Sequence, residues 1–374
     1  MSHPFASTGL DIDDRLAACF GKDGIEAPTP VQQRAIPLVL AGKDVIIQSG
    51  TGTGKTLAYV LPLLQRAGRE PDFRAVIIAP SPELAMQILR TVEAYKAQGV
   101  RSTSLVGSGN IERQKEKLKA HPQIIAGTPG RVLEMIFARK VKTKSIKALV
   151  LDEVDQILSD QNDAELKEVC SRPEFEAQII LASATIAKRA EAFAREAMHE
   201  ERLRPSVDRS PLPQNIEHRF MVFAAERSES ALVRLIRGLD IDRALVFVHK
   251  GYTVPKLFHA LVNHQIPCAT LSAEADKRQR QQAIEALRSG AARVLVATDA
   301  AARGLDIKDL RWVIHFELAN DKQAYLHRAG RTGRAGKRGT SIVMVTKDEL
   351  PALERQAREL RLELAEVGLD AADR

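Results

Sequence analysis

The feature that most constrains the fold is a glycine-rich octapeptide at residues 49–56. Its sequence is Ser49-Gly50-Thr51-Gly52-Thr53-Gly54-Lys55-Thr56. An apolar run at 45–47 precedes it, and the stretch 57–61 that follows has the composition of a helix. Glycine allows the backbone to turn tightly between the two. A strand, a glycine-rich turn and a helix in immediate succession predict an α/β domain.

The same octapeptide is typical of a loop that binds phosphate. Backbone N–H groups in such a loop point at one anion, and the helix that follows adds its positive dipole end. Lys55 can reach the β- and γ-phosphates of a nucleotide, and the Thr56 hydroxyl can bind Mg²⁺. Ser49 stands where the common pattern has glycine. A flexible turn beside a surface lysine is the alternative, but the flanking strand and helix patterns argue against it.

Alternating patterns extend the α/β prediction to the whole chain. The expected strands are 44–48, 75–79, 102–106, 123–127, 147–151, 178–182, 217–223, 244–248, 268–271, 292–296, 311–315 and 339–345. Between them, the expected helices include 83–97, 111–119, 187–197, 227–237, 253–264, 277–288 and 347–366. Such alternation predicts mainly parallel sheets that are covered by helices on both faces.

A proline-rich break divides the chain. Three prolines fall between residues 204 and 214, and this spacing favours an extended linker. We therefore expect an N-terminal domain at 1–207, a short linker at 208–214 and a C-terminal domain at 215–374. The 374 residues of the chain are many for a single core and suit two domains of ordinary size.

The composition favours a cytoplasmic protein, and no low-complexity tail is evident at either end of the sequence. No apolar run approaches the roughly 20 residues of a membrane span, and the N-terminus lacks the regions of a secretory signal. Cys19, Cys170 and Cys268 are few and far apart, so neither a disulfide framework nor a zinc site is expected. The formal net charge of +7 permits a polyanionic partner.

The acidic pair Asp152-Glu153 directly follows a buried-strand pattern. Asp152 can hold Mg²⁺ through water, because Mg²⁺ keeps part of its hydration shell. Glu153 can orient and deprotonate a water molecule that attacks a phosphate. Adjacent acids also occur on surfaces and at helix N-termini. The glycine-rich loop upstream favours the catalytic interpretation, because such loops and strand-end acids work together in phosphate sites.

Polar groups follow several expected strands where those strands end. They are Pro80-Ser81, Thr128-Pro129-Gly130-Arg131, Ser183-Ala184-Thr185 and Thr298-Asp299. Open α/β sheets bind ligands at the carboxyl ends of their strands. We therefore expect these groups to converge on one rim, together with the phosphate loop.

Two further patterns suit a bound nucleoside triphosphate. Arg331 and Arg334 lie three residues apart. One planar guanidinium group can bind two phosphoryl oxygens at once. Both arginines belong to the C-terminal domain, so they would reach a nucleotide only when the domains close. A basic surface loop is the alternative. Gln32 carries an amide that can pair with N6 and N7 of adenine, although the sequence around it also suits a plain helix start.

Together these motifs resemble the DEAD-box RNA helicases of helicase superfamily 2. The ordered set runs from Phe5 to about residue 346. The resemblance implies two tandem RecA-like domains that use ATP and Mg²⁺, bind RNA and separate short duplexes locally. Residues 152–155 read Asp-Glu-Val-Asp, with valine in place of the family's alanine, and every carboxylate is kept.

The resemblance also implies roles for single residues. At the nucleotide it implies stacking by Phe5, adenine recognition by Gln32 and a ribose contact by Asp306. It implies that Ser183, Thr185 and His327 link hydrolysis to unwinding, and that Arg331 and Arg334 are arginine fingers. The residues that would hold the RNA backbone are Pro80, Gly109, Thr128, Gly130, Arg131, Arg280 and Thr298. Backbone contacts carry no sequence information, so RNA binding should be nonspecific.

The chain departs from the family pattern on the RNA side. Pro82 stands where the family usually has arginine, although Ser81 as N-cap and Pro82 at the first helical position still predict a good helix start. The other departures are Ser108 before Gly109, Ser272-Ala273, and Lys277. None removes a side chain of the ATP site. We therefore hypothesise ordinary ATP binding with altered RNA affinity or coupling.

The expected function is RNA-stimulated ATP hydrolysis with local, non-processive unwinding of RNA duplexes or remodelling of RNA–protein complexes. An ATP-gated RNA clamp and a DNA helicase are the alternatives. Ribosomal or ribonucleoprotein assembly partners fit the expected RNA helicase function.

A basic cluster comprises Arg139, Lys140, Lys142, Lys144 and Lys147, and a second lies at 277–280. Each cluster suits either a polyanion or a solvated surface. We expect the amphipathic segment 347–366 to pack on its own domain, with a partner-binding face as the alternative.

Overall fold

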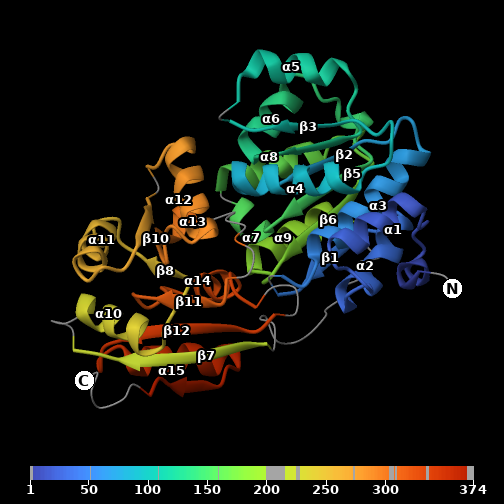
Figure 1. Ribbon diagram of the computed structural model, residues 1–374. Coiled ribbons are helices and arrows are strands. Elements are labelled where there is room, and N and C mark those ends of the chain that lie inside the picture. The colour runs from blue at the N-terminus through green and yellow to red at the C-terminus, as the bar shows by residue number, and fades with distance from the viewer. Residues whose placement is uncertain are drawn as a thin grey trace. The chain divides into compact units, whose positions relative to one another are not determined.

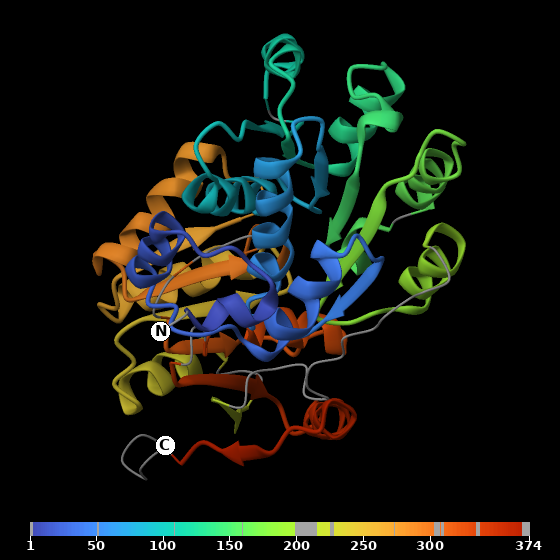
Figure 2. The same ribbon diagram turned by 90° about the vertical axis from the view of Figure 1, so that its right-hand side faces the viewer.

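The computed structural model shows two compact α/β units (Figures 1 and 2). Unit 1 lies mainly within residues 1–209 and unit 2 mainly within residues 210–374. The structure describes residues 3–50, 52–107, 109–158, 160–198, 215–224, 228–272, 274–302, 307, 310–333 and 337–368. The linker predicted at 208–214 lies outside these residues, and the domain limits stay a prediction.

Unit 1 contains a six-stranded sheet with the order β1-β6-β5-β2-β4-β3. Its strands are β1 (Val45–Gln48), β2 (Ala75–Ile78), β3 (Ser102–Leu105), β4 (Ile124–Gly127), β5 (Ala148–Asp152) and β6 (Gln178–Ser183). Its helices are η1 (Pro4–Thr8), α1 (Asp14–Lys22), α2 (Pro30–Leu40), α3 (Lys55–Arg69), α4 (Pro82–Tyr95), α5 (Ile111–Lys119), α6 (Pro129–Phe137), η2 (Thr143–Ser145), α7 (Val154–Ile157), α8 (Asp160–Cys170) and α9 (Lys188–Ala197). All of the strand pairings are parallel.

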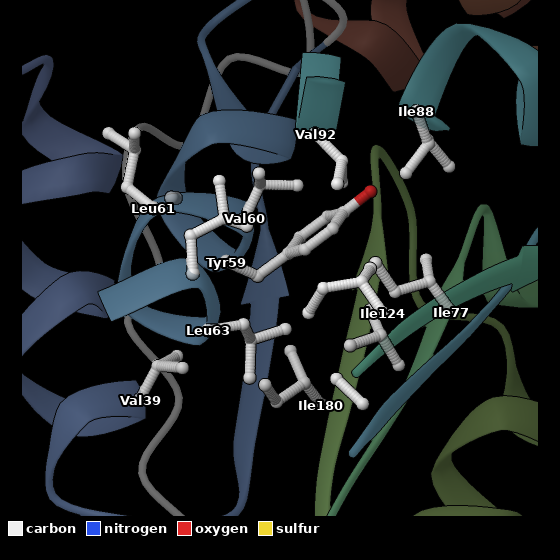
Figure 3. Close-up of a cluster of buried hydrophobic side chains, with 14 of the residues drawn as sticks. Val39, Tyr59, Val60, Leu61, Leu63, Ile77, Ile88, Val92, Ile124 and Ile180 are labelled. Carbon is white, nitrogen blue, oxygen red and sulfur yellow. The ribbon is translucent and has the colours of Figure 1, made fainter. Parts of the chain in front are cut away.

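The strands of unit 1 bury both faces of their sheet. Ile47, Ile77 and Val150 lie in one core with helices α1 to α4, whereas their neighbours in sequence pack against helices α5 to α9 on the other face. Side chains alternate between the faces of a strand, so a continuous apolar run fills two cores at once. Figure 3 shows the first core around the ring of Tyr59, which lies among aliphatic side chains such as Leu63 and Val92.

Unit 2 repeats this plan with a seven-stranded sheet of order β13-β7-β12-β11-β8-β10-β9. Its strands are β7 (Ile216–Val222), β8 (Ala244–Val248), β9 (Cys268–Leu271), β10 (Val294–Thr298), β11 (Trp312–His315), β12 (Gly339–Val345) and β13 (Leu364–Glu366). Its helices are α10 (Ser228–Gly238), α11 (Thr253–Asn263), α12 (Lys277–Ser289), α13 (Asp299–Ala302), α14 (Lys322–Ala329) and α15 (Leu350–Leu360). Helices α10 and α11 cover one face, and α12 and α13 belong to a core on the other.

The predicted fold class is confirmed in both units, since each contains a parallel sheet between helices. One helix prediction was wrong at its end. The segment 347–366 was expected to be helical throughout, but α15 ends at Leu360 because Arg361 adopts a left-handed conformation with φ of 57°. Residues Leu364–Glu366 then pair with β7 at the sheet edge. Leu353 and Leu360 are buried in the core of unit 2, as the packing interpretation predicted.

Candidate active site

The phosphate loop links β1 to α3, as the sequence predicted. Gly52 and Gly54 have φ angles of 81° and 94°, a region that favours glycine. The Ser49 hydroxyl donates to Thr53 Oγ1 at 2.8 Å, and the Lys55 ammonium donates to the Ser49 carbonyl at 2.6 Å. Gly50 precedes the turn, whereas Thr51 lies outside the described residues. Lys55 is thus folded back over a loop whose geometry suits a phosphate group.

Gln32 is buried against the end of this loop. Its Oε1 accepts from the Thr29 backbone N–H at 2.9 Å, and its Nε2 donates to the Gly54 carbonyl at 3.2 Å. A Cβ atom at Gly54 would collide with the same Nε2, so this close approach requires glycine. The α2 helix therefore braces the phosphate loop through one amide.

The position of the Phe5 side chain differs from the stacking on the nucleotide that the family resemblance implied. Its side chain is fully buried, and its ring stacks on Phe20 with centroids 4.4 Å apart. A ring in this position cannot stack on adenine without leaving the core of unit 1. The burial follows from η1, which packs Phe5 inward against α1 and α2 rather than leaving it on the surface.

Asp152 ends β5 with only 4% of its surface exposed. Burial raises the pKa of its carboxyl group, and the adjacent charge of Glu153 raises it further. The Tyr59 hydrogen bond and the Lys55 charge act in the opposite direction but do not cancel the rise. A desolvated carboxylate whose charge is incompletely compensated favours binding of a cation.

Tyr59 joins the two residues that were predicted to hold Mg²⁺. Its hydroxyl donates to Asp152 Oδ2 at 2.7 Å and also forms a hydrogen bond with the Thr56 side chain. Sequence reasoning missed Tyr59, although its place three residues after Thr56 on α3 puts both on one helix face. Within the residues that the structure describes, no three His, Cys, Asp or Glu side chains form a metal cluster.

Glu153 has an unusual backbone. Its φ of 56° is left-handed, and it occupies the turn between β5 and α7. Each of the other described non-glycine residues with positive φ follows the end of a helix; they are His121, Arg139, Asp240, Gln265 and Arg361. Left-handed residues are common at helix ends but uncommon before a helix, where they often mark functional sites. The turn fixes Glu153 directly beside Asp152.

Asp155 connects two predicted motifs. One of its oxygens, Oδ2, accepts from the Thr185 hydroxyl at 2.7 Å and from the Ser183 hydroxyl at 3.5 Å. The other accepts from the Ala187 backbone N–H at 2.9 Å. The segment after β6 is therefore tied to the segment after β5, as expected for polar groups at neighbouring strand ends.

The predicted RNA-contact residues of unit 1 also lie at strand ends. Thr128 is the N-cap of α6, and a Cβ atom at Gly130 would meet no other atom within 4 Å. Pro80 follows β2, and the predicted N-cap of the next helix is confirmed, because the Ser81 hydroxyl accepts from the Leu84 N–H. The open space beside Gly130 means that packing within the protein does not explain the glycine, whereas a ligand close to the backbone would.

The Arg131 side chain, which was expected to contact RNA phosphate, binds groups of the protein itself. Its guanidinium donates to the carbonyls of Gly107 and Gly109, each at 3.2 Å, and forms an ion pair with Glu134 at 2.9 Å. It also donates to Gln114 Oε1 at 3.1 Å. Arg131 thus supports the loop that carries Gly109 and brings two predicted RNA residues together.

Unit 2 holds its predicted residues through contacts with its own backbone. The Arg280 guanidinium donates to the Ala301 carbonyl at 2.6 Å, and the Thr298 hydroxyl accepts from the Ala301 N–H at 3.3 Å. His327 lies on α14, and Arg331 follows that helix with partial exposure. Asp306 and Arg334 lie outside the described residues.

A buried arginine in unit 2 was not predicted. Arg328 is 1% exposed, and its guanidinium binds both carboxylate oxygens of Asp299, each at 2.6 Å. A third nitrogen donates to the Glu317 carbonyl, also at 2.6 Å. The pairing is bidentate and fixes α14 to the end of β10. Its signal in the sequence was an arginine inside an otherwise apolar helix face.

Comparison with known proteins identifies the family. The DEAD/DEAH box helicase profile matches residues 29–193, and the helicase conserved C-terminal domain profile matches residues 227–336. The probable ATP-dependent RNA helicase YfmL of Bacillus subtilis is 41% identical over 346 residues, which cover 92% of this chain and 91% of YfmL. The chain belongs to the DEAD-box ATP-dependent RNA helicases. It is therefore an ATP-hydrolysing enzyme of that family, as its motifs implied.

Another helicase sequence and two solved structures are also similar to this chain. The helicase CshC of Bacillus cereus is 39% identical over 352 residues, which cover 94% of this chain and 90% of CshC. Among solved structures, S. cerevisiae Dbp5 bound to RNA and ADP BeF3 has a TM-score of 0.85 at 27% identity, with 100% and 97% of the two chains covered. Mss116p bound to ssRNA and AMP-PNP has a TM-score of 0.82 at 25% identity, with 97% and 78% covered.

Over the part of the chain that the structure describes, every helix is too short or too polar to cross a lipid bilayer.

Proposed function

We propose that this protein hydrolyses ATP in an RNA-stimulated reaction and uses the cycle to open short RNA duplexes locally. The observation that carries the proposal is the hydrogen-bonded chain from Thr56 through Tyr59 to Asp152, with Glu153 in the adjoining turn. Three polar groups from α3 and the end of β5 are thereby linked to one another, and Glu153 follows Asp152 directly.

At the nucleotide, Lys55 leaves the Ser49 carbonyl and binds the β- and γ-phosphates, while backbone N–H groups from Ser49 to Thr56 surround them. Thr56 and Asp152 would hold Mg²⁺, which would supply positive charge to the phosphate oxygens. Glu153 accepts a proton from the attacking water. Gln32 reads the adenine with the donor and acceptor capacity that its two protein contacts leave.

Coupling to RNA runs through Asp155. Its carboxylate joins the turn that carries Glu153 to Ser183 and Thr185, so a shift at the phosphates reaches the segment after β6. In unit 2, His327, Arg331 and Arg334 complete the site when the units close on ATP, with Asp306 at the ribose.

RNA is held through its sugar–phosphate backbone, without sequence preference. Thr128 and Gly130 bind phosphate at the N-terminus of α6, which offers free N–H groups, and Pro80 and Gly109 lie on neighbouring strand ends. Arg280 and Thr298 shape the corresponding segment of unit 2. Pro82 removes one positive charge from this surface, so a Pro82→Arg variant should bind RNA more tightly while its affinity for ATP stays unchanged.

The proposal is tested by measuring duplex separation beside ATP hydrolysis. A short RNA duplex with a single-stranded overhang should separate with ATP, and not with ADP or with a Glu153→Gln variant. RNA-stimulated hydrolysis without strand separation would contradict the unwinding part and indicate an ATP-gated clamp. Equal stimulation by DNA of the same sequence would contradict the choice of RNA.

A further inference from the structure

The basic cluster at 139–147 has no part in the site described above. It lies between the end of α6 and the start of β5. Strands β4 and β5 are both parallel to β2, so α6 begins at the carboxyl end of the sheet and returns to its amino end (Figure 1). The cluster therefore lies at the amino ends of the strands, whereas the candidate active site lies at their carboxyl ends.

A hollow of about 580 Å³ occurs at this place. Its apolar part includes Ile136 and Phe137, and its cationic part consists of Arg139, Lys142, Lys144 and Arg172. Pockets that bind small molecules have volumes of roughly 300–1,000 Å³. We call this hollow the basic pocket.

Charge in the basic pocket is unbalanced. Arg172 forms an ion pair with Glu168 at 3.0 Å. Arg139, Lys142 and Lys144 are exposed, and their side chains have no carboxylate partner among the residues that the structure describes. The single acidic lining residue, Glu174, accepts from the Thr143 hydroxyl at 2.9 Å. With Glu168 counted, four cations thus meet two carboxylates, and the ligand that this excess of positive charge favours is an anion.

The segment that carries the lysines is fixed in place. Val141, Thr143 and Ile146 are buried, while Lys142 and Lys144 alternate with them on the exposed side. The Ser145 hydroxyl donates to the Lys142 carbonyl at 2.6 Å and accepts from Arg74 Nη1 at 2.8 Å. A fixed backbone lowers the entropy that is lost when these side chains bind a ligand.

An exposed aromatic ring lies beside these charges. Phe137 is 39% exposed, and the Arg172 guanidinium lies over its ring, 5.3 Å from the centroid. A positively charged groove with an accessible aromatic face is the usual arrangement for binding single-stranded nucleic acid, because phosphates meet the cations and a base stacks on the ring. An acidic peptide would use the charges but not the ring.

Helix α6 relates the basic pocket to the active-site rim. Thr128 is its N-cap, Gly130 lies in its first turn, and its last residue is Phe137. Nine residues of helix span about 13 Å. A strand of RNA that passes the first turn can therefore continue along the helix to its end.

We propose that the basic pocket is a second, sequence-independent contact for single-stranded RNA, and that it holds the part of a strand that extends past the rim of unit 1. The inference rests on the proposed RNA-binding function. It adds a separate surface that long RNA uses and short RNA does not.

The test compares RNA lengths in fluorescence anisotropy titrations. The variant Lys142→Ala with Lys144→Ala should bind long single-stranded RNA several-fold more weakly, with a slope of log affinity against log salt that is less steep by about 0.7 for each lost phosphate contact. Its affinity for RNA just long enough to stimulate ATP hydrolysis fully should not change. The matched control is Lys22→Ala with Lys119→Ala, which removes the same charge from exposed positions of unit 1 outside the pocket.

A second variant tests the aromatic face. Phe137→Leu keeps an apolar side chain but removes the stacking surface, so it should weaken binding of long single strands and leave duplex binding unchanged. An equal loss in the Lys22/Lys119 control, or an unchanged affinity for long RNA in the Lys142/Lys144 variant, would overturn the proposal. Failure of the proposed function would look different, because RNA would then not stimulate ATP hydrolysis by the unaltered protein.

Discussion

Units 1 and 2 share a parallel sheet covered on both faces, but they treat the acids at the ends of their strands differently. In unit 1, Asp152 has a raised pKa because burial and Glu153 outweigh the stabilising effects of Tyr59 and Lys55. In unit 2, Asp299 receives two short bonds from the buried Arg328. One acid is left undercompensated and the other is fully paired.

This contrast distinguishes an acid that is expected to serve catalysis from an acid that is expected to stabilise the fold. A buried charge that its own protein compensates poorly is costly, and it is kept where a substrate or ion completes the compensation. A bidentate pair between a buried arginine and a partly exposed aspartate needs no ligand and fixes two elements to each other. We therefore expect substitutions at Asp152 and Glu153 to affect activity, and substitutions at Arg328 and Asp299 to affect stability first.

The largest effect is expected at Glu153. A Glu153→Gln variant keeps the side-chain shape but removes the base, so ATP turnover should fall by about 10²–10⁴. Its urea unfolding curve should stay unchanged, and steady-state phosphate release measures the turnover. A variant that retained its turnover would remove the distinction between the acids of the two units.

The next effect is expected at Arg328. Arg328→Met leaves Asp299 without its bidentate partner and should lower the free energy of unfolding of unit 2 by about 3 kcal/mol, the lower end of the range for a broken buried pair, because the Asp299 side chain is 31% exposed and can be hydrated in part. Adding Asp299→Leu should restore much of that loss, because an apolar pair replaces the ionic one. Chemical denaturation of both variants checks the prediction, and no recovery in the double variant would argue against a self-contained pair.

Unit 2 should also lose stability in acid. His218 is buried beside the Tyr325 hydroxyl, and burial lowers its pKa to about 4. Between pH 6.5 and pH 4 the unfolded chain binds a proton that the folded chain does not, so the free energy of unfolding falls as the pH decreases through this window, by roughly 3 kcal/mol at most. His218→Gln should show a shallower dependence when unfolding is followed at several pH values. An unchanged slope would mean that other groups dominate.

A pair of glycines in unit 1 gives the smallest expected effects. Gly54→Ala places a side chain at a φ of 94° and against Gln32, so it should cost about 1–3 kcal/mol of stability and weaken ATP binding. Gly130→Ala meets open space and should change stability by less than about 0.5 kcal/mol while it weakens RNA binding. Thermal unfolding and titrations with ATP and RNA distinguish the two. A destabilised Gly130→Ala protein would show that this glycine serves the fold.

The sequence was sufficient for the sheets because central strands such as β2, β5 and β8 are buried on both faces, and the glycine-rich loop and strand-end acids follow local patterns. It was insufficient where the outcome depends on tertiary packing. β13 consists of three residues whose pairing depends on β7. Phe5 was expected at the nucleotide but stacks on Phe20, and no local pattern specifies that partner. Tyr59 and Arg328 were missed because each becomes important through a residue far away in the sequence.

The most direct test of the central claim is ATP turnover by the unaltered protein with and without single-stranded RNA. The account predicts that RNA raises phosphate release severalfold at saturating ATP, and that DNA of the same sequence raises it much less. Equal rates with and without RNA would contradict the account.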